Sequence, residues 1–242
     1  MSTGPQLLRL TSIGSTMDLL HELAADGAAA GTVVVADEQT AGRGSRGRPW
    51  RSPRGGLWLS VLYRPAAAVG VELFSLRAGL AVAEAIETVL PGLRVAIKWP
   101  NDIMLDDRKL GGILGEARWQ GEALAWVVVG VGLNVANPIP TELRDMAVRL
   151  ADLAPELAVE TLEPAVSARL RSLAPGRARL DEAELHALRQ RDWLLGRRLH
   201  APTPGVAAGV AADGVLLVRD SAGALQEVRA GTVELAQPTL TS

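Results

Sequence analysis

The chain of 242 residues contains no cysteine. This absence excludes disulfide bonds, thiolate metal sites and any mechanism that needs a cysteine nucleophile. Phenylalanine and tyrosine occur once each, whereas tryptophan occurs six times. Four of the tryptophans lie in or beside segments rich in glycine and charge, which are also the segments where we expect function.

Long apolar runs are also missing. No uninterrupted stretch is long enough to span a bilayer, and the first residues, MSTGPQLLRL, have no apolar signal core. The formal net charge of −2 creates no global basic field that would attract nucleic acid or an anionic membrane. We therefore expect a cytoplasmic protein that binds neither nucleic acid nor a membrane.

Two common catalytic signatures are absent as well. The sequence has no Walker-type G-x-x-x-x-G-K-[ST] motif, so a bound nucleotide would depend on side-chain cations for its phosphates. The histidines His21, His186 and His200 are isolated, and none has metal-ligand spacing. A metal hydrolase or a triad hydrolase is therefore disfavoured, and we expect each histidine to be a surface or packing residue.

The apolar periodicity predicts an α+β fold. A helix follows Ser15, where Ser15-Thr16-Met17-Asp18 fits a capping box. Other helices are predicted near 73–90, 162–173 and 181–193, and strands near 32–36, 57–63, 95–97, 103–105, 113–114 and 125–131. The short turns predicted at Asn101-Asp102, Asp106-Asp107 and Gln120-Gly121 imply antiparallel strands within 94–135. Short strands between about 199 and 228 suggest a small barrel.

Residues 40–56 form a long loop rich in glycine and arginine. Gly42-Arg43-Gly44-Ser45-Arg46-Gly47 is a literal G-x-G-x-x-G, but the prolines that follow prevent the helix that a Rossmann site requires. Glycines allow close approach of the backbone to a ligand, and Arg43, Arg46 and Arg48 offer forked donors for phosphate. Trp50 could lie over a flat ring. A solvated basic loop or a grip on single-stranded nucleic acid are the alternatives.

Two further segments combine glycine with polar residues. Lys98-Trp99-Pro100-Asn101-Asp102 ends a strand in a turn, and Arg108-Lys109-Leu110-Gly111-Gly112 enters the next strand. Gly130-Val131-Gly132-Leu133-Asn134 interrupts an apolar strand, which often marks close approach of a ligand. Each segment alone could equally be a capped turn, a solvated lysine or a bulge. Their occurrence together is what favours a binding site.

Six segments of the sequence resemble the biotin–protein ligase family in order and approximate spacing. They are Ser12-Ile13-Gly14-Ser15-Thr16, Gln39-Thr40-Ala41-Gly42-Arg43-Gly44, Arg46-Gly47-Arg48-Pro49-Trp50, Lys98-Trp99-Pro100-Asn101-Asp102, Arg108-Lys109-Leu110-Gly111-Gly112-Ile113-Leu114 and Gly130-Val131-Gly132-Leu133-Asn134. The resemblance is close over residues 12–135 and extends to the C-terminal segment, which is similar to the SH3-like domain of that family.

The resemblance implies a mixed sheet flanked by helices, similar to class II aminoacyl-tRNA synthetases and lipoate ligases, in residues 1–192. It implies an SH3-like β-barrel in residues 193–242. It also implies that ATP and biotin react to biotinyl-5′-AMP and pyrophosphate, with Mg²⁺ as cofactor. Biotin then passes to a lysine of the biotin carboxyl carrier domain of a carboxylase. The metal ligands and any homo-oligomer remain open.

The same resemblance implies a role for each matching residue. Lys109, Arg43 and Arg48 would be catalytic, with Lys109 at the biotin carboxylate and the α-phosphate. Ser15, Thr16 and Gln39 would hydrogen-bond the ureido ring of biotin. The remaining residues would line the pocket or contact the nucleotide: Gly42, Gly44, Trp50, Asp102, Gly112, Gly130, Gly132 and Asn134.

The chain departs from the family in three respects. Ser45 stands where arginine is often found, so either Arg46 substitutes for it or the loop closes less firmly over the adenylate. Met17 stands where asparagine is common. The Ser12–Thr16 segment lies near the start of the sequence, so we expect neither an N-terminal DNA-binding domain nor operator binding. A lipoate–protein ligase is the nearest alternative, whereas a related octanoyl transferase would need a cysteine.

Overall fold

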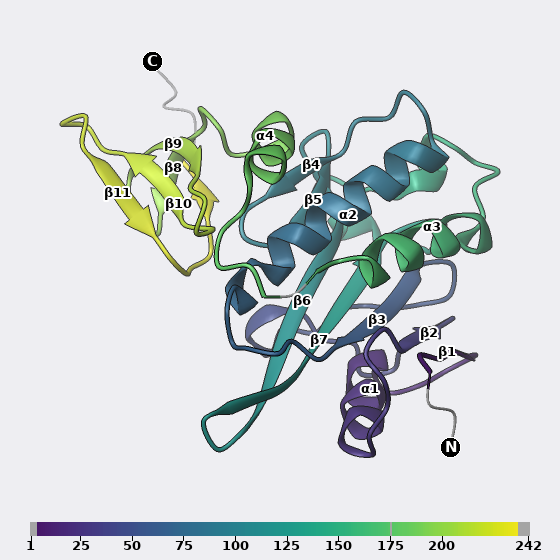
Figure 1. Cartoon of the computed structure of the whole chain (residues 1–242). Coiled ribbons are helices and arrows are strands. Elements are labelled where there is room, and N and C mark those ends of the chain that lie inside the picture. Colours follow the sequence, from purple (N-terminus) through teal and green to yellow (C-terminus); the bar gives the residue numbers. More distant parts are fainter. Residues whose placement is uncertain (1–3, 175, 237–242) are drawn as a thin grey trace.

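The computed structural model describes residues 4–174 and 176–236. Its largest element is a seven-stranded sheet in the order β1-β2-β3-β7-β6-β5-β4 (Figure 1). The strands are β1 Leu7–Leu10, β2 Val33–Ala36, β3 Leu57–Tyr63, β4 Ala96–Lys98, β5 Asp102–Leu105, β6 Arg108–Gln120 and β7 Ala123–Leu133. β1 pairs with β2 in parallel and all other neighbours pair antiparallel, so the predicted mixed sheet is confirmed.

β6 and β7 form the long central hairpin of this sheet. The sequence predicted only residues 113–114 of β6, because glycine and charged residues on either side have low strand propensity. Pairing with β7 over most of its length overrides that propensity, since paired residues run from Gly111 opposite Leu133 to Gln120 opposite Ala123. Gly121, with a φ of 60°, makes the turn at the position that the sequence predicted.

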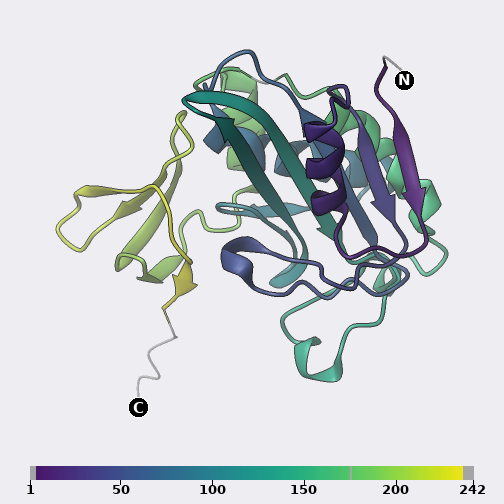
Figure 2. The same cartoon turned by 90° about the horizontal axis from the view of Figure 1, so that it is seen from below.

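Helices cover both faces of the sheet (Figures 1 and 2). The α-helices are α1 Thr16–Ala25, α2 Phe74–Val89, α3 Val159–Arg171 and α4 Glu182–Arg191, and single 3₁₀ turns occur at Ser45–Gly47, Val71–Leu73, Thr141–Leu143 and Leu150–Asp152. α2 and α3 pack against the main core on one face. α1 packs on the opposite face, where Met17 and Leu20 bury against Leu62 and Val128.

The capping box predicted at Ser15 is wrong. Ser15 does occupy the N-cap position of α1, with φ −152° and ψ 134°, but its side chain makes no capping hydrogen bond. Its hydroxyl oxygen instead accepts a hydrogen bond from Nη1 of Arg43, 3.2 Å away, and Arg43 also pairs with Asp18. A side chain that reaches α1 from a distant loop therefore displaces the local cap.

A second antiparallel sheet follows α4, in the order β11-β10-β9-β8-β12, and fits an SH3-like domain. Its strands are β8 Arg198–Ala201, β9 Gly205–Val210, β10 Leu216–Arg219, β11 Leu225–Val228 and β12 Glu234–Leu235. The predicted domain boundary after residue 192 stays a prediction, and residues 237–242 of the predicted second domain lie outside the described residues.

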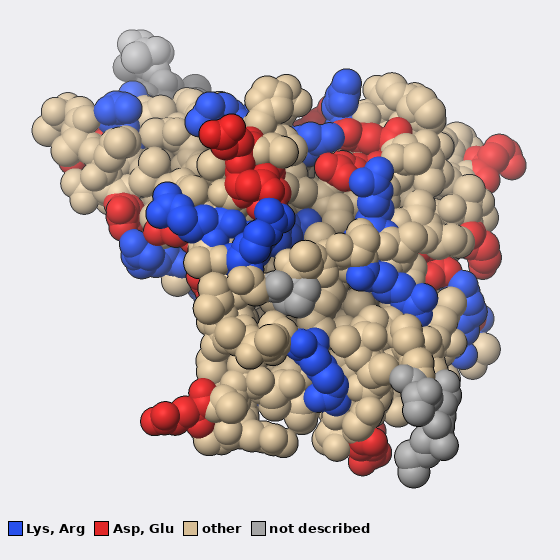
Figure 3. Space-filling view, viewed as in Figure 1, with Lys and Arg blue, Asp and Glu red and all other residues tan. Residues whose placement is uncertain are grey.

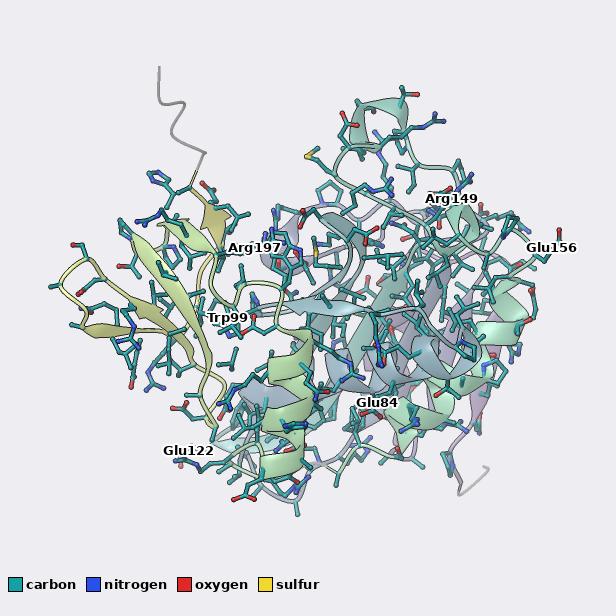
Figure 4. All side chains as sticks on the ribbon, turned by 90° about the horizontal axis from the view of Figure 1, so that it is seen from above. Glu84, Trp99, Glu122, Arg149, Glu156 and Arg197 are labelled. Carbon is teal, nitrogen blue, oxygen red and sulfur yellow. The ribbon has the colours of Figure 1, made fainter. Side chains whose placement is uncertain are left out.

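The two sheets are joined by specific contacts. Trp99 lies between them (Figure 4), and its indole N–H donates to the carbonyl oxygen of Gly214 at 2.9 Å. Trp193 follows α4, and its backbone N–H donates to the carbonyl oxygen of Ile97 in β4. Leu194 is fully buried in the same core as α2 and the large sheet. The second sheet is therefore packed onto the first.

Charged side chains of both signs are interspersed over the face that carries α2 and α3 (Figure 3). This face therefore shows no extended basic surface of the kind that nucleic-acid backbones require. The helices were also compared with the requirements for a membrane span: none within residues 4–174 and 176–236 has both the length and the apolar character needed to cross a bilayer.

Candidate active site

The candidate site lies on the sheet face that also carries α1. Alternate residues of a strand point to the same face, and on β7 this series runs Trp126, Val128, Gly130 and Gly132. The first two are large and packed against α1, whereas the last two have no side chain. The sheet is thus covered by α1 at one end. At the other, more open end, Met17 and the ring of Trp50 lie directly against the glycines.

A cavity of about 240 Å³ occupies this open end. All but two of the residues predicted for the site line it: Ser15, Thr16, Gln39, Arg43, Gly44, Arg48, Trp50, Asp102, Lys109, Gly112, Gly130 and Gly132. Segments that are far apart in the sequence therefore meet around one space. The arginine-bearing loop and the lysine-bearing strand lie on its wall together, as the resemblance implied.

Two predicted residues are placed elsewhere. A side chain at Gly42 would lie 2.6 Å from the hydroxyl of Ser52 and from the carbonyl oxygen of Trp50, so this glycine serves the internal packing of the loop. Asn134 is buried, donates to the carbonyl oxygen of Val148 at 3.2 Å and accepts from Asn137 at 3.1 Å. The nucleotide contact predicted for Asn134 stays a prediction.

Hydrogen bonds fix the polar wall of the cavity. Oε1 of Gln39 accepts from both the backbone N–H and the hydroxyl of Thr16, at 2.9 and 3.1 Å. Its Nε2 donates to the hydroxyl of Ser52, and the hydroxyl of Thr16 also bonds Ser60. The orientation of the Gln39 amide is thereby set. Within the described residues, its second N–H and the hydroxyl hydrogen of Ser15 are left to donate to a ligand.

A β-bulge brings Lys109 to the cavity. Lys109 and Gly112 are three positions apart, so in a regular strand these positions would point to opposite faces. The register between β5 and β6 shifts at Ile103, and both positions then point into the cavity. Nζ of Lys109 lies 2.5 Å from Oδ1 of Asp102 and 5.1 Å from the ring centroid of Trp50.

Trp50 forms the floor next to the glycine strand. Its ring lies where a side chain at Gly132 would be, since a Cβ there would come within 2.5 Å of Nε1. That indole N–H is buried and has no hydrogen-bond partner among the described residues. A buried donor without a partner is unfavourable, so a ligand acceptor at this point would be stabilising.

The arginines Arg43, Arg46 and Arg48 differ in how they are engaged. Arg43 pairs with Glu116 and Asp18, so two carboxylates surround its guanidinium. Arg46, in the left-handed region with φ 60°, donates to the hydroxyl of Thr232, just before β12 of the second sheet. The side chain of Arg48 is exposed and donates a hydrogen bond to the hydroxyl of Ser45. Of these three, Arg48 therefore has the greatest freedom to bind a phosphate.

Sequence reasoning missed Glu116 on β6. Its Oε2 lies 3.0 Å from Nε2 of His21, and Nδ1 of His21 accepts from the indole N–H of Trp126 at 2.9 Å. Hydrogen bonding from His21 and then pairing with Arg43 lower the pKa of Glu116 to about 2, against a raising effect of burial. Burial fits His21 as the packing residue that the sequence predicted. The hydrogen-bonded partners among Arg43, Glu116, His21 and Trp126 are 73 to 105 residues apart in the sequence, so no local pattern links them.

A second cavity of about 300 Å³ adjoins the first and shares Ser45, Arg48, Asn101 and Asp102 with it. It lies between the large sheet and the segment 229–233 of the second sheet. Cationic side chains of Arg46, Arg48, Lys98 and Arg229 contribute to its lining. The two cavities together offer a neutral polar end and a cationic end.

The chain belongs to the biotin/lipoate A/B protein ligase family, because residues 10–134 match the model of that family. The bifunctional ligase/repressor BirA of Bacillus subtilis (strain 168) is 40% identical over 158 residues, which are 63% of this chain and 48% of that protein. The chain thus spans about half the length of this relative.

Other similar proteins are covered more completely. A biotin–[acetyl-CoA-carboxylase] ligase of Paracoccus denitrificans is 33% identical over 205 residues, which are 78% of this chain and 85% of that protein. The solved structure of biotin protein ligase from Aquifex aeolicus in complex with biotin and ATP matches with a TM-score of 0.76 and 26% identity. That match covers 96% of this chain and 99% of the Aquifex chain.

Proposed function

We propose that the protein is an ATP-dependent biotin–protein ligase. It forms biotinyl-5′-AMP and pyrophosphate, then transfers biotin to a lysine of the biotin carboxyl carrier domain of a biotin-dependent carboxylase. The observation that carries the proposal is the shared cavity, in which the polar wall of Thr16 and Gln39 faces Lys109. Names of the similar proteins, among them ligases with biotin and ATP bound, point to the same activity.

The polar wall suits the ureido ring of biotin. A ureido group has one carbonyl acceptor and two N–H donors, so it needs donors and acceptors at fixed positions. Ser15 and the second N–H of Gln39 can donate to the carbonyl oxygen, because their other hydrogen bonds are already set. Glycines at 130 and 132 let Met17 and the ring of Trp50 lie directly against the sheet, where they line the cavity beside this polar wall. This geometry gives the vitamin one preferred orientation.

Adenylation requires two anions to approach each other. A carboxylate oxygen of biotin attacks the α-phosphorus of ATP, the P–O bond to the β-phosphate breaks, and pyrophosphate leaves. Lys109 and Arg48 line the same cavity and neutralise the charge that would otherwise keep the two anions apart. The adjoining cationic cavity beside Lys98 and Arg229 offers space for the leaving pyrophosphate.

Mg²⁺ fits this site as an ion that arrives with ATP. No group of three or more potential metal-ligating side chains occurs among the described residues, and Asp102 is the carboxylate in the first cavity. Mg²⁺ commonly binds through one carboxylate, water and the substrate phosphates, so this donor set suits it. When bound, the ion would add positive charge at the phosphates. Asp102 would hold it while remaining close to Lys109.

Transfer follows from the reactivity of the mixed anhydride. The uncharged amine of an acceptor lysine attacks the activated carbonyl carbon of biotin, the amide bond forms, and AMP leaves with the bonding electrons. Open water would hydrolyse the same anhydride, so the wall formed by Gly44, Ser45 and Trp50 serves to exclude solvent. The arginine loop is thus both a ligand wall and a cover.

A lipoate–protein ligase is the nearest alternative within the same family. The dithiolane ring of lipoate has no hydrogen-bonding groups comparable to a ureido ring, so it would leave the donors of Ser15 and Gln39 unpaired. ATP–pyrophosphate exchange with biotin or lipoate as the carboxylic acid separates the two. We expect exchange with biotin at least about a hundredfold faster, the scale seen when buried polar groups lose their partner. Faster exchange with lipoate would refute the proposal.

A further inference from the structure

Residues 42–50 form a small hairpin, here called the arginine hairpin. The backbone N–H of Trp50 donates to the carbonyl oxygen of Gly42 at 2.9 Å, and the N–H of Gly44 donates to that of Arg48 at 2.8 Å. Residues from both of its arms line the first cavity. The position of this hairpin therefore decides whether the cavity is covered.

Arg43 attaches the base of the hairpin to the catalytic sheet. Its Nε donates to Oε1 of Glu116 at 2.9 Å, and Nη2 donates to Oε2 at 3.1 Å. Its Nη1 lies 2.6 Å from Asp18 and donates to the hydroxyl of Ser15 at 3.2 Å. The forked guanidinium thus joins the hairpin, α1 and β6. These hydrogen bonds also leave Ser15 free to donate its own hydrogen into the cavity.

Glu116 is held in turn from behind. The indole N–H of Trp126 can only donate, so Nδ1 of His21 accepts and the imidazole hydrogen lies on Nε2. That N–H then donates to Oε2 of Glu116, 3.0 Å away. Trp126 thus donates to His21 and His21 donates to Glu116, whose carboxylate also accepts from Arg43. We call this chain the buttress.

The electrostatics agree with this geometry. Two carboxylates, Glu116 and Asp18, lie against the single charge of Arg43. The hydrogen bond to Glu116 is the main cause that raises the pKa of Arg43. A guanidinium neutralised in this way attracts a phosphate less strongly than the exposed Arg48. The structure therefore favours an anchoring role for Arg43.

We propose that Glu116, supported by His21 and Trp126, is a positioning residue that holds the arginine hairpin over the ligand cavity and orients the hydroxyl of Ser15. Its part in ligand binding rests on the proposed function, whereas its hold on the hairpin does not. Glu116 itself touches neither reacting atom. Its effect on the reaction passes through Arg43.

The substitution Glu116→Gln tests the buttress with little change in size. Glutamine offers one acceptor oxygen, which Arg43 would take, and its amide N–H would then face the N–H of His21. If His21 moved its hydrogen to Nδ1 to relieve this, that hydrogen would face the N–H of Trp126. With either tautomer of His21, two N–H donors face each other, so residue 116 is held less firmly and its hydrogen bonds to Arg43 weaken.

Trypsin reports on the hairpin without any ligand, because it cleaves after the exposed Arg46, whereas Pro49 blocks cleavage after Arg48. We expect Glu116→Gln to raise the cleavage rate there about tenfold, the scale of one charge-assisted hydrogen bond, with cleavage after the remote Arg94 unchanged. The matched control is Glu122→Gln, because Glu122 is exposed in the turn between β6 and β7 (Figure 4). If both variants are cleaved like the wild type, the proposal is wrong.

Steady-state kinetics give the second readout. We expect Glu116→Gln to raise the KM for biotin about tenfold, through Ser15 and the hairpin together, with a smaller rise in the KM for ATP through the hairpin alone and kcat within about twofold of wild type. Uniformly faster cleavage at all sites, or equal changes in both KM values, would mean a purely structural role and would overturn the proposal. Trp126→Phe keeps an aromatic ring, although a smaller one, and removes the N–H. It should shift the same readouts in the same direction, by about threefold, even if Glu116→Gln does not fold.

The trypsin and the kinetic measurements can also fail independently of the proposed function. A wild-type protein that forms no biotinyl-AMP would refute the proposed function, yet the trypsin arm would still test the hold on the hairpin. An active wild type with unchanged hairpin cleavage in Glu116→Gln would overturn the buttress alone.

Discussion

Nζ of Lys109 lies 2.5 Å from Oδ1 of Asp102, at the place where the bulge between β5 and β6 directs both side chains into the cavity. Each side chain is partly exposed, at 30% and 24%. The pair is therefore accessible to a ligand and can exchange its partner. A carboxylate or phosphate oxygen that enters the cavity competes with Asp102 for the ammonium group.

Removal of this ammonium group should abolish most adenylation. We predict that Lys109→Ala lowers the rate of biotin-dependent pyrophosphate release by about a hundredfold or more, the scale of one preorganised charge-stabilising donor. Arg94→Ala is the control, because the Arg94 side chain is 86% exposed and lies away from the cavity lining. Near-normal pyrophosphate release from Lys109→Ala would remove Lys109 from the mechanism.

Loss of the Asp102 carboxylate should change the metal requirement. We predict that Asp102→Asn raises the Mg²⁺ concentration for half-maximal adenylation by about tenfold, because an amide oxygen lacks the charge that binds a hard cation. Asp107→Asn serves as the control, since the Asp107 side chain is 73% exposed and pairs with Arg197. An unchanged Mg²⁺ dependence in Asp102→Asn would show that other groups hold the ion.

Ser45 and Met17, two of the departures from the family, both line the cavity. Serine cannot make the forked contacts of arginine, so we predict that Ser45→Arg slows release of biotinyl-AMP, by about fivefold or more. Rapid filtration after a single turnover measures that release. Equal release rates in both forms would make residue 45 inconsequential.

Ligand binding should order residues 40–56. We predict that biotin with ATP protects this segment from trypsin, because a hairpin held against a ligand loses its open, cleavable states. Biotin with AMP, which cannot form the adenylate, is the matched control and should protect less. The same cleavage rate with and without biotin and ATP would contradict a covering role for the loop.

Glu116 should make stability depend on pH in a defined window. Its pKa is lowered from 4.5 to about 2 in the folded protein, so its stabilising effect is complete above about pH 4.5 and is lost as the pH falls toward 2. We predict that the difference in unfolding free energy between wild type and Glu116→Gln is constant near neutral pH and shrinks below about pH 4.5. Urea unfolding at several pH values measures it, and a constant difference would argue against the pair with Arg43.

The sequence predicted the parts of the fold that depend on local pattern. Strand 57–63 was predicted with the bounds of β3, and the turns at Gln120 and Asp106 are where they were expected. The strands β8 to β11 were also located, because glycine turns and apolar runs alternate there, whereas the two-residue β12 was not. Strands and turns of this kind depend on the types of neighbouring residues, so they can be predicted without knowledge of tertiary contacts.

Tertiary contacts explain what the sequence could not give. Ser15 was expected to cap α1, but Arg43 takes its hydroxyl from a loop 28 residues away. Arg43 was expected at a phosphate, yet it pairs with Glu116, a residue with no distinguishing sequence context. The bulge that directs Lys109 into the cavity also has no signal in the sequence that predicted it. Long-range pairing of polar side chains was the missing information.

The central feature of the proposed function is a cavity in which the protein holds biotin against ATP before it transfers biotin to a lysine. The most direct measurement is mass spectrometry of a biotin carboxyl carrier domain after incubation with the protein, ATP, Mg²⁺ and an equimolar mixture of biotin and lipoate. We predict that the carrier gains one biotinyl group at a single lysine, and only when ATP is present. A carrier that stays unmodified, or that gains a lipoyl group instead, would contradict the account.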